Sequence, residues 1–267
     1  MKKIVVAIPS DLHCGHIVGL TPPDWQGSVD LASRDSRKKM AHIQQEGWAR
    51  YVAAMKKNKP DACIWNGDLV DGKGKRSGGC EQITTDMNEQ VEMACDCVRA
   101  ANATENYFIR GTPYHTGDGE QFEDNIAKEF NTKAHDHPPI EVGGVIIDAK
   151  HKVGASSIPH GRFTSVAKEV LWNILWAAHD GAEKADVIVR SHVHYFGHVD
   201  WFIGPSQVHA ITTPALQWRG TRYGKQQCVG TVDFGIVFLH ITDGNVTVHP
   251  EIMQIPMGFD PLIRSGL

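Results

Sequence analysis

A regular alternation of short apolar runs and amphipathic stretches limits the folds open to this chain. The apolar runs have the length of single buried β-strands, and they cover residues 4–8, 62–66, 107–109, 142–149 and 186–189. The amphipathic stretches carry apolar residues at helical spacing, and they cover residues 36–57, 86–101, 122–130 and 164–179. One such stretch lies between each pair of runs, which predicts an α/β fold.

The last part of the chain has a different pattern. It is rich in strands without intervening helices, and the expected strands cover residues 198–203, 208–212, 231–241 and 246–253. Consecutive strands after an alternating region indicate a mixed sheet or two packed sheets. The 267 residues contain no internal repeat or low-complexity linker, so we expect a single domain over residues 1–267.

Carboxylates and imidazoles follow all five runs of the alternating region. They are Asp11 and His13 after the first run, Asp68 after the second, His115 after the third, His151 after the fourth, and His192 and His194 after the fifth. Ligands of α/β sheets gather at the carboxyl ends of the strands. Mixed Asp and His sets suit Mn, Fe, Zn or Ni better than Ca, which prefers oxygen ligands alone. The pattern therefore predicts a site for divalent metal at one edge of the sheets.

The order of these motifs resembles that of the calcineurin-like metallophosphoesterase superfamily, whose compact stand-alone members occur in bacteria and bacteriophages. The matching motifs are Asp11-Leu12-His13, Gly67-Asp68, Gly111 with a nearby His, His151, and His192-Val193-His194. The resemblance implies a β-sandwich of two mixed sheets flanked by helices. It also implies a dinuclear metal site at the carboxyl ends of the strands, with the later strands forming part of the second sheet.

The same resemblance implies a role for each ligand. Asp11, His13 and His194 would bind the first metal, His151 and His192 the second, and Asp68 would bridge the two. Two such cations clamp a phosphoryl group and lower the pKa of a water between them, so the implied reaction is hydrolysis by a metal-bound hydroxide. His160 competes with His151 for the second metal, and His151 is preferred because it directly follows its strand.

The third motif departs from the family pattern. The family has Gly-Asn-His, whereas this chain has Gly111-Thr112-Pro113-Tyr114-His115 and offers no Asn to the second metal. The hydroxyl of Thr112 or a water would take that place. His115 is the candidate for the group that steadies or protonates the leaving oxygen. Ser191 stands where the family has Gly, and a small residue should be tolerated there.

The residues after Asp68 bear on the substrate. Protein Ser/Thr phosphatases carry a phosphate-binding Arg where this chain has Gly72, which disfavours that activity. Lys73 and Arg76 follow in a glycine-rich loop, and they are either a basic rim that attracts an anionic substrate or part of a mobile, solvated loop. Without a dedicated Arg for a dianion, a phosphodiesterase is favoured over a phosphomonoesterase. A catalytically inactive scaffold on the same fold is the alternative from another class.

The charge limits the partners further. The chain has 27 Lys+Arg against 31 Asp+Glu, a net charge of −4, which disfavours tight binding to long duplexes. A nucleotide or a short or single-stranded nucleic acid stays a candidate substrate. No stretch has the 18 apolar residues of a membrane helix, and the apolar run after Lys3 is too short for a signal peptide. We therefore expect a cytoplasmic protein, and the oligomeric state is left open.

The chain has 15 histidines, more than the metal site needs. His16 fits a loop position, and His135 and His137 fit a solvated turn. His198 and His209 lie in expected strands and stay open between a structural and a ligand role. Trp25 and Trp218 would either cap the pocket by stacking or belong to the core.

Overall fold

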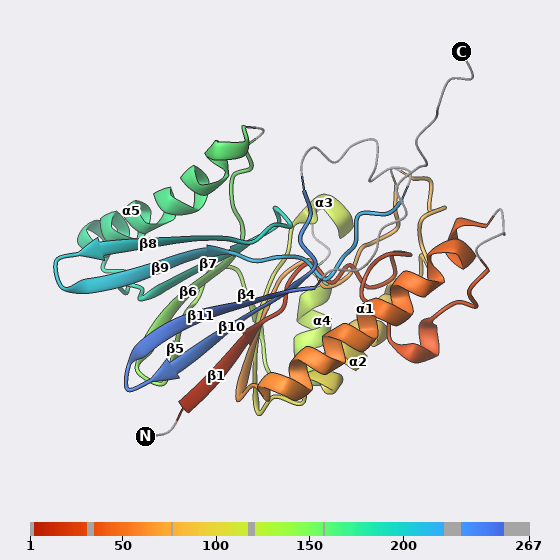
Figure 1. Ribbon diagram of the computed structural model, residues 1–267, viewed down its shortest axis with the longest axis horizontal. Helices are drawn as coiled ribbons and strands as arrows, with labels where there is room; N and C mark the ends of the chain where they lie inside the picture. Colours follow the sequence, from red (N-terminus) through yellow and green to blue (C-terminus); the bar gives the residue numbers. More distant parts are fainter. Residues whose placement is uncertain are drawn as a thin grey trace, which may run out of the picture.

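Two β-sheets pack face to face in this protein, and helices cover the outer face of each sheet (Figure 1). The computed structural model describes residues 3–30, 35–75, 77–116, 121–156, 158–221 and 231–253. Each sheet contains both parallel and antiparallel pairs. The predicted α/β fold, a sandwich of two mixed sheets flanked by helices, is therefore confirmed.

The first sheet has six strands in the order β11-β10-β1-β2-β3-β4. The strands are β1 (Lys3–Ile8), β2 (Ala62–Asn66), β3 (Glu105–Ile109), β4 (Ala134–His135), β10 (Gly235–Thr242) and β11 (Asn245–Ile252). Strands β1 to β4 pair in parallel, whereas β10 pairs antiparallel with β1 and with β11. The parallel strands are the ones that the helical stretches connect, because parallel neighbours require a crossover.

The second sheet has five strands in the order β5-β6-β7-β9-β8. They are β5 (Pro139–Val142), β6 (Val145–Lys152), β7 (Val187–Ser191), β8 (Gly197–Ile203) and β9 (Ser206–Thr212). The inner strands β6, β7 and β9 pair in parallel, and the edge strands β5 and β8 pair antiparallel with their neighbours. The carboxyl ends of β6 and β7 consequently lie side by side.

Helices close the sandwich on both sides. The helices are α1 (Ser36–Asn58), α2 (Met87–Ala101), α4 (Phe122–Glu129) and α5 (Arg162–Asp180), with the short turns η1 (Pro23–Trp25), α3 (Pro113–Thr116) and η2 (Pro159–Gly161). Helices α1, α2 and α4 pack over the first sheet, and α5 packs over the second. Asp86 caps α2 by accepting a hydrogen bond of 2.8 Å from the backbone N of Asn88.

The apolar runs are continuous because both faces of the strands are covered. In β1, Val5 and Ala7 face the helices, while Val6 and Ile8 face the second sheet. A strand buried on both faces has no solvent side to alternate with, so its sequence reads as one apolar block. A third apolar layer lies between α5 and the second sheet, around Val166.

The predicted bounds of the strand over 142–149 are wrong at both ends. The structure has a β-hairpin, β5–β6, that turns at Gly143 and Gly144, both with positive φ (60° and 79°). Two such residues suit a two-residue hairpin turn, so Val142 closes β5 instead of opening β6. Strand β6 then continues to Lys152, which places His151 inside the strand and not after it. The turn expected around His135 contains the short edge strand β4.

A buried ion-pair network holds the second sheet to α5. The guanidinium of Arg190 is fully buried, and it donates from Nη1 to Asp148 Oδ1 and from Nε to Glu169 Oε2, each at 2.7 Å. His137 Nε2 lies 2.7 Å from the same Oδ1 of Asp148. These contacts join β6, β7 and α5 directly behind the strand ends. His137 lies in an exposed bend, as the sequence predicts, and it also has a structural partner in Asp148.

This network predicts an acid-dependent loss of stability. Burial raises the pKa of Asp148, but the hydrogen bonds from His137 and Arg190 outweigh burial and hold it at about 2. Because this value lies below the unfolded value of about 3.9, the carboxylate stabilises the fold above about pH 4, and the contribution disappears as the pH falls through 2. We expect urea midpoints between pH 4 and 2 to fall more steeply for the wild type than for Asp148→Asn. The exposed-turn variant Asp243→Asn should keep the wild-type slope, and equal slopes for all three proteins would contradict the prediction.

Candidate metal centre

Six of the side chains singled out in the sequence converge where β1, β2, β6 and β7 end. They form two groups of one carboxylate and two imidazoles each, namely Asp11, His13 and His194, and Asp68, His151 and His192. Within a group, the candidate ligand atoms all lie within 4.8 Å of one another. The first group is the set that the family resemblance implies for the first metal, and the second joins the two histidines implied for the second metal to Asp68, the implied bridging ligand.

The first group centres on one oxygen of Asp11. Its Oδ1 lies 3.1 Å from His194 Nε2 and 3.9 Å from His13 Nε2, and the two imidazole nitrogens are 3.4 Å apart. Asp11 and His13 are fully buried, whereas His194 keeps a side chain that is 21% exposed. The group is thus closed on the protein side and reachable past His194.

The second group centres on Asp68. Its Oδ2 lies 3.0 Å from His151 Nε2 and 3.8 Å from His192 Nδ1. Here too two members are buried, and the third, His192, is partly exposed. The two groups touch through Asp11 Oδ1, which lies 3.8 Å from His151 Nε2. They therefore form one continuous cluster of ligand atoms.

The backbone is strained at most of these positions. Nine non-glycine residues have positive φ in the part of the chain that the structure describes, and five belong to the cluster: Asp11 (50°), His13 (47°), Asp68 (50°), His192 (72°) and His194 (55°). Such a conformation costs roughly 1–2 kcal/mol for an ordinary residue. Strain of this kind concentrates at functional sites, where the surrounding structure over-determines it.

Contacts between loops hold the strained conformations in place. The backbone N of Asp11 donates to Gly67 O at 3.0 Å, and the N of His13 donates to Asp68 O at 3.1 Å. The backbone N of His192 donates to Asp11 Oδ2 at 3.3 Å. The turns after β1, β2 and β7 are therefore tied to each other and carry their ligands as a unit.

Two glycines of the sequence motifs make room for the cluster. A Cβ on Gly67 would overlap the ring of His151, and one on Gly111 would overlap the carboxylate of Asp68. Gly67 also has a φ of +81°. The glycines are thus needed because two ligands lie directly against the backbone of a neighbouring loop.

Two groups that the sequence analysis did not single out orient the imidazoles. Asp71 Oδ1 lies 2.9 Å from His13 Nδ1, and the backbone O of Asn66 lies 2.6 Å from His151 Nδ1. An acceptor on one ring nitrogen leaves the lone pair of a neutral imidazole on the other, which here is the Nε2 that faces the cluster and that a cation would bind in place of a proton. A signal for Asp71 was present, because it follows Asp68 by three residues in the same short motif.

Buried hydroxyl groups connect the strand ends beneath the cluster. Ser191 Oγ accepts a 2.6 Å hydrogen bond from Asn66 Nδ2 and lies 2.7 Å from Thr213 Oγ1, which in turn lies 2.6 Å from Ser10 Oγ. Ser191, which stands where the family has Gly, therefore has a structural role, because its hydroxyl joins β7 to β2.

The altered third motif supports Asp68. The backbone N of Thr112 donates to Asp68 Oδ1 at 2.6 Å, and its Oγ1 lies 3.3 Å and 3.2 Å from the two carboxylate oxygens. Thr112 thus holds the carboxylate that turns its Oδ2 toward the imidazoles. His115 lies in α3, and its side chain is outside the described part of the structure, as is the whole of Arg76.

The hydroxyl of Thr112 should therefore matter for metal binding. We expect Thr112→Val to weaken metal affinity by about 10- to 100-fold, the usual effect of removing a group that orients a ligand. Thr112→Ser keeps the hydroxyl and should stay within a few fold of the wild type. Isothermal titration with Mn²⁺ or Zn²⁺ measures both, and equal affinities for the Val and Ser variants would rule out this role.

The remaining candidates lie elsewhere. His160 is exposed in η2 and belongs to neither group, so His151 is the histidine that the structure brings to the cluster. His16 lies 3.7 Å from Glu81, and Lys73 is exposed. Trp218 is buried against Phe234, which agrees with a core position. Trp25 lies 3.4 Å from Asp96, at the surface of α2.

The electrostatics of the cluster draw positive charge to it. Burial raises the pKa of Asp11, but the imidazoles of His194 and His151 outweigh burial and lower it to about 2. Burial lowers the pKa of His151, but the carboxylates of Asp68 and Asp11 raise it to about 10. Two buried carboxylates that stabilise the charged form of the imidazoles beside them thus favour a cationic partner.

The donor atoms fit divalent metal ions. Asp11 Oδ1 and His151 Nε2 are buried and have no hydrogen-bond partner, although both lie at the centre of the cluster. A buried polar atom without a partner is costly, and cation binding is one way to satisfy it. Imidazole nitrogen with carboxylate oxygen is a ligand set for Mn, Fe, Zn or Ni, as the sequence predicts.

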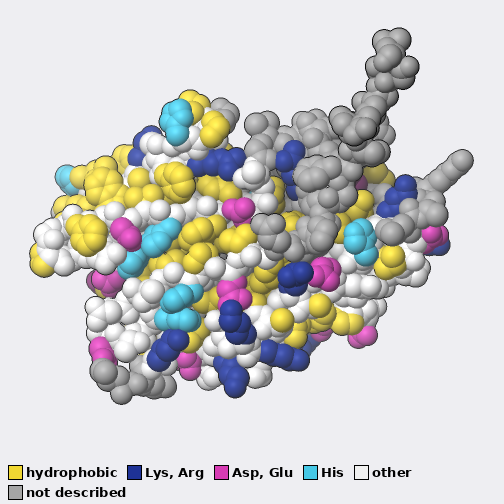
Figure 2. All heavy atoms as spheres, viewed as in Figure 1, with side chains coloured by type: hydrophobic (Ala, Val, Ile, Leu, Met, Phe, Trp, Pro, Cys, Tyr) yellow, Lys and Arg dark blue, Asp and Glu magenta, His cyan; other side chains and the backbone are white. Residues whose placement is uncertain are grey.

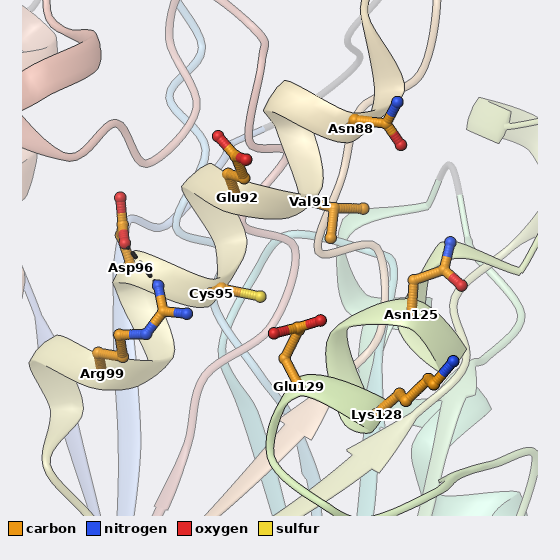
Figure 3. A pocket seen from close by; sticks show the side chains of 9 residues that line it. All are labelled: Asn88, Val91, Glu92, Cys95, Asp96, Arg99, Asn125, Lys128 and Glu129. Carbon is orange, nitrogen blue, oxygen red and sulfur yellow. Dashed lines mark hydrogen bonds and ion pairs between the residues drawn. The ribbon is translucent and has the colours of Figure 1, made fainter.

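A hollow lies between α2 and α4 (Figure 3). It is lined by mixed charges that include Glu92, Asp96, Glu129, Arg99 and Lys128, and none of the six clustered side chains borders it. Burial raises the pKa of its one thiol, Cys95, to about 11, so the thiol stays protonated and unreactive at neutral pH.

Among the described residues, no helix is long and apolar enough to cross a membrane.

Three solved structures are similar to this chain over most of its length. Wild-type Vps29 of Entamoeba histolytica, described as complexed with Zn²⁺, is 14% identical, covers 93% of this chain and 99% of its own, and has a TM-score of 0.45. The Thermotoga maritima protein TM1076 is 15% identical (94% and 99% covered, TM-score 0.37). The Thermus thermophilus sulfate thiohydrolase SoxB, in complex with glycerol, is 12% identical (94% and 56% covered, TM-score 0.40).

No protein-family model matches the chain, and no curated protein matches it.

Proposed function

We propose that residues 1–267 form a single metal-dependent phosphoesterase domain of the calcineurin-like type, and that it hydrolyses a phosphodiester. One observation carries the proposal: two groups of one carboxylate and two imidazoles touch through Asp11 Oδ1 and His151 Nε2, 3.8 Å apart. Two adjacent sites of this composition suit two adjacent divalent cations. Ions placed in this way are the common arrangement for displacement at phosphorus.

Each group would hold one ion. Asp11, His13 and His194 would hold the first, and Asp68, His151 and His192 the second. Bound there, a pair of divalent ions supplies Lewis acidity for the phosphoryl oxygens and lowers the pKa of a nearby water. The sequence-based assignment of Asp68 as the bridging ligand stays part of this proposal, and Asp11 Oδ1 is the atom that lies between the groups in the structure.

The protein's own residues would orient the ligand imidazoles and leave one side open to the substrate. Asp71 and the carbonyl of Asn66 face the outer nitrogens of His13 and His151, which keeps the inner nitrogens unprotonated when cations are bound. His192 and His194 are the partly exposed members, so the substrate would approach from their side. His115 stays our candidate for protonating the leaving oxygen, because α3 follows Thr112 directly.

Two arginines close to the strand ends support a diester over a monoester. Arg110 is engaged by Asp124 and Asp136, and Arg190 by Asp148 and Glu169. Neither is thus available to neutralise the second charge of a phosphomonoester. A diester carries one negative charge, and so needs less positive charge from side chains. A nucleotide or a short, single-stranded nucleic acid is the proposed substrate class, which the net charge of −4 allows.

The test combines metal counting with hydrolysis. Protein stripped with chelator is reloaded in turn with Mn²⁺, Fe²⁺, Zn²⁺ and Ni²⁺, its metal content is measured, and release of nitrophenol is followed. We expect about two ions at the catalytic centre and faster hydrolysis of bis(p-nitrophenyl) phosphate than of p-nitrophenyl phosphate. Cyclic nucleotides and short single-stranded oligonucleotides then narrow the natural substrate class.

The results of this experiment distinguish a phosphodiesterase from a phosphomonoesterase and from an inactive scaffold. Faster cleavage of the monoester would support a phosphomonoesterase on the same centre. Bound metal without turnover of any ester would support the inactive scaffold, which the missing Asn of the third motif motivates. Failure to bind any of the four metals would overturn the proposal as a whole.

A further inference from the structure

A third group of metal-ligating side chains lies outside the catalytic cluster, on the hairpin of β8 and β9. The group consists of His198, Asp200 and His209. Asp200 is directly opposite His209 in the antiparallel register, and His198 lies two residues before Asp200 on the same face of the strand. The ladder of the hairpin therefore fixes all three side chains on one face. Rigid strands hold ligands more accurately than loops do.

The three candidate ligand atoms are close together. Asp200 Oδ1 lies 2.9 Å from His198 Nε2 and 2.7 Å from His209 Nδ1, and the two nitrogens are 3.2 Å apart. The ligand atoms of a tetrahedral zinc ion with bonds of about 2.0–2.1 Å would be separated by about 3.3 Å. The group thus already has nearly the dimensions of one face of such a site.

Hydrogen bonding alone satisfies this arrangement poorly. A carboxylate oxygen only accepts, so two N–H groups donating to Asp200 Oδ1 would bring their hydrogens together between nitrogens that are 3.2 Å apart. If one nitrogen instead gives its lone pair to the other ring, that ring can no longer donate fully to Asp200. A cation between the three atoms would accept all three lone pairs at once.

The group of His198, Asp200 and His209 lies where an ion from solvent can reach it. Strand β8 is the edge of the second sheet, and the group shares its face with Ile211, which belongs to the apolar layer between the sheets. Side-chain exposure rises from 10% at His209 through 27% at His198 to 40% at Asp200. Figure 2 shows histidine and acidic side chains together on this side of the molecule, over β8 and β9. The site would be a shallow one, anchored on the buried side and open to water.

The protonation states agree with metal binding. Burial and the neighbouring His209 lower the pKa of His198 and outweigh the opposite effect of Asp200, so its ring is neutral at neutral pH. Burial raises the pKa of Asp200, but His198 and His209 lower it further, and a side-chain hydrogen bond from Gln207 adds to the lowering. Gln207 thereby orients the carboxylate in the way that groups around a metal ligand do.

We propose that His198, Asp200 and His209 form a separate site for a borderline divalent cation of the Zn²⁺ class, with its remaining coordination positions filled by water. An ion there would join β8 to β9 at the edge of the second sheet. Because a ligand that binds only the folded state stabilises it, loading this site should raise the melting temperature. The site is independent of the catalytic cluster and does not rest on the proposed phosphoesterase activity.

The experiment compares zinc stoichiometry between full-length variants. Chelator-treated protein is dialysed against Zn²⁺, and bound zinc per chain is measured for the wild type, His198→Gln, Asp200→Asn and the control His179→Gln. His179 is an exposed histidine of α5 and belongs to none of the three groups. We expect His198→Gln and Asp200→Asn each to bind one zinc ion fewer than the wild type, whereas the control keeps the wild-type number. The difference does not depend on how many ions the catalytic cluster holds, so failure here is distinguishable from failure of the proposed function.

A second measurement guards against misfolding. Melting temperatures recorded in chelator establish that each variant folds, and the rise on adding Zn²⁺ should be smaller for the two site variants than for the control. Equal zinc stoichiometry in all four proteins would overturn the proposal. So would a loss of melting temperature in chelator with no change in bound zinc, because that result would make the group a hydrogen-bonded triad only.

Discussion

Asp68→Asn is expected to lower kcat/KM for phosphodiester hydrolysis by about 10³-fold or more. The carboxylate lies 3.0 Å from His151 and 3.8 Å from His192, and it is the one carboxylate of the second group. The amide of Asn has nearly the same shape but no charge, so the second ion would lose its anionic ligand. Loss of about 4 kcal/mol of transition-state stabilisation corresponds to a 10³-fold change.

The measurement is kcat/KM with a chromogenic diester, together with the metal content of the same sample. Glu92→Gln is the matched control, because it makes the same kind of exchange in the hollow between α2 and α4. We expect the control to keep wild-type activity and metal content. Activity within tenfold of the wild type for Asp68→Asn would show that the second group is not catalytic.

Arg190→Met should reduce the free energy of unfolding by about 3–5 kcal/mol. The substitution keeps an unbranched apolar stem but removes the guanidinium, so the buried carboxylate of Asp148 keeps only His137 and that of Glu169 keeps only Lys150 as a basic partner. An uncompensated buried charge is far more costly than the loss of an exposed pair. Urea denaturation at neutral pH measures the change.

A surface pair provides the control for this second experiment. Arg50 and Glu46 are neighbours at helical spacing on α1, with side chains that are 41% and 44% exposed. Arg50→Met should change the free energy of unfolding by less than about 1 kcal/mol, because solvent screens such pairs. If both Met variants lose the same small amount, then Arg190 does not hold β6, β7 and α5 together.

The order of elements and the candidate ligands were predictable because both depend on local patterns. A strand buried on both faces gives an apolar block, and the polar residue that follows it must lie at the end of the sheet. The sandwich of two mixed sheets is confirmed, and the structure brings together all six residues that the sequence analysis assigned to metal. That these residues bind metal stays a prediction.

Apart from Asp71, the groups that support the ligands could not be predicted, because they depend on contacts between distant loops. The carbonyl of Asn66 reaches His151 across 85 positions of sequence, and Thr112 reaches Asp68 across 44. No local pattern encodes such pairs. The predicted start of β6 was wrong for a different reason. Gly143 and Gly144 form a tight hairpin turn inside a stretch that reads as one apolar run in the sequence.

The left-handed backbone at five ligands has a consequence for how this protein tolerates change. At roughly 1–2 kcal/mol each, these residues together cost about 5–10 kcal/mol, which is comparable to the net stability of an ordinary domain. The packing of the sandwich and the hydrogen bonds between the loops together offset this cost. A substitution deep in the apolar layers of the sandwich, far from any ligand, would thus first release the turns that present the ligands. Mutational damage to the interior should be visible as lost metal affinity before it is visible as global unfolding.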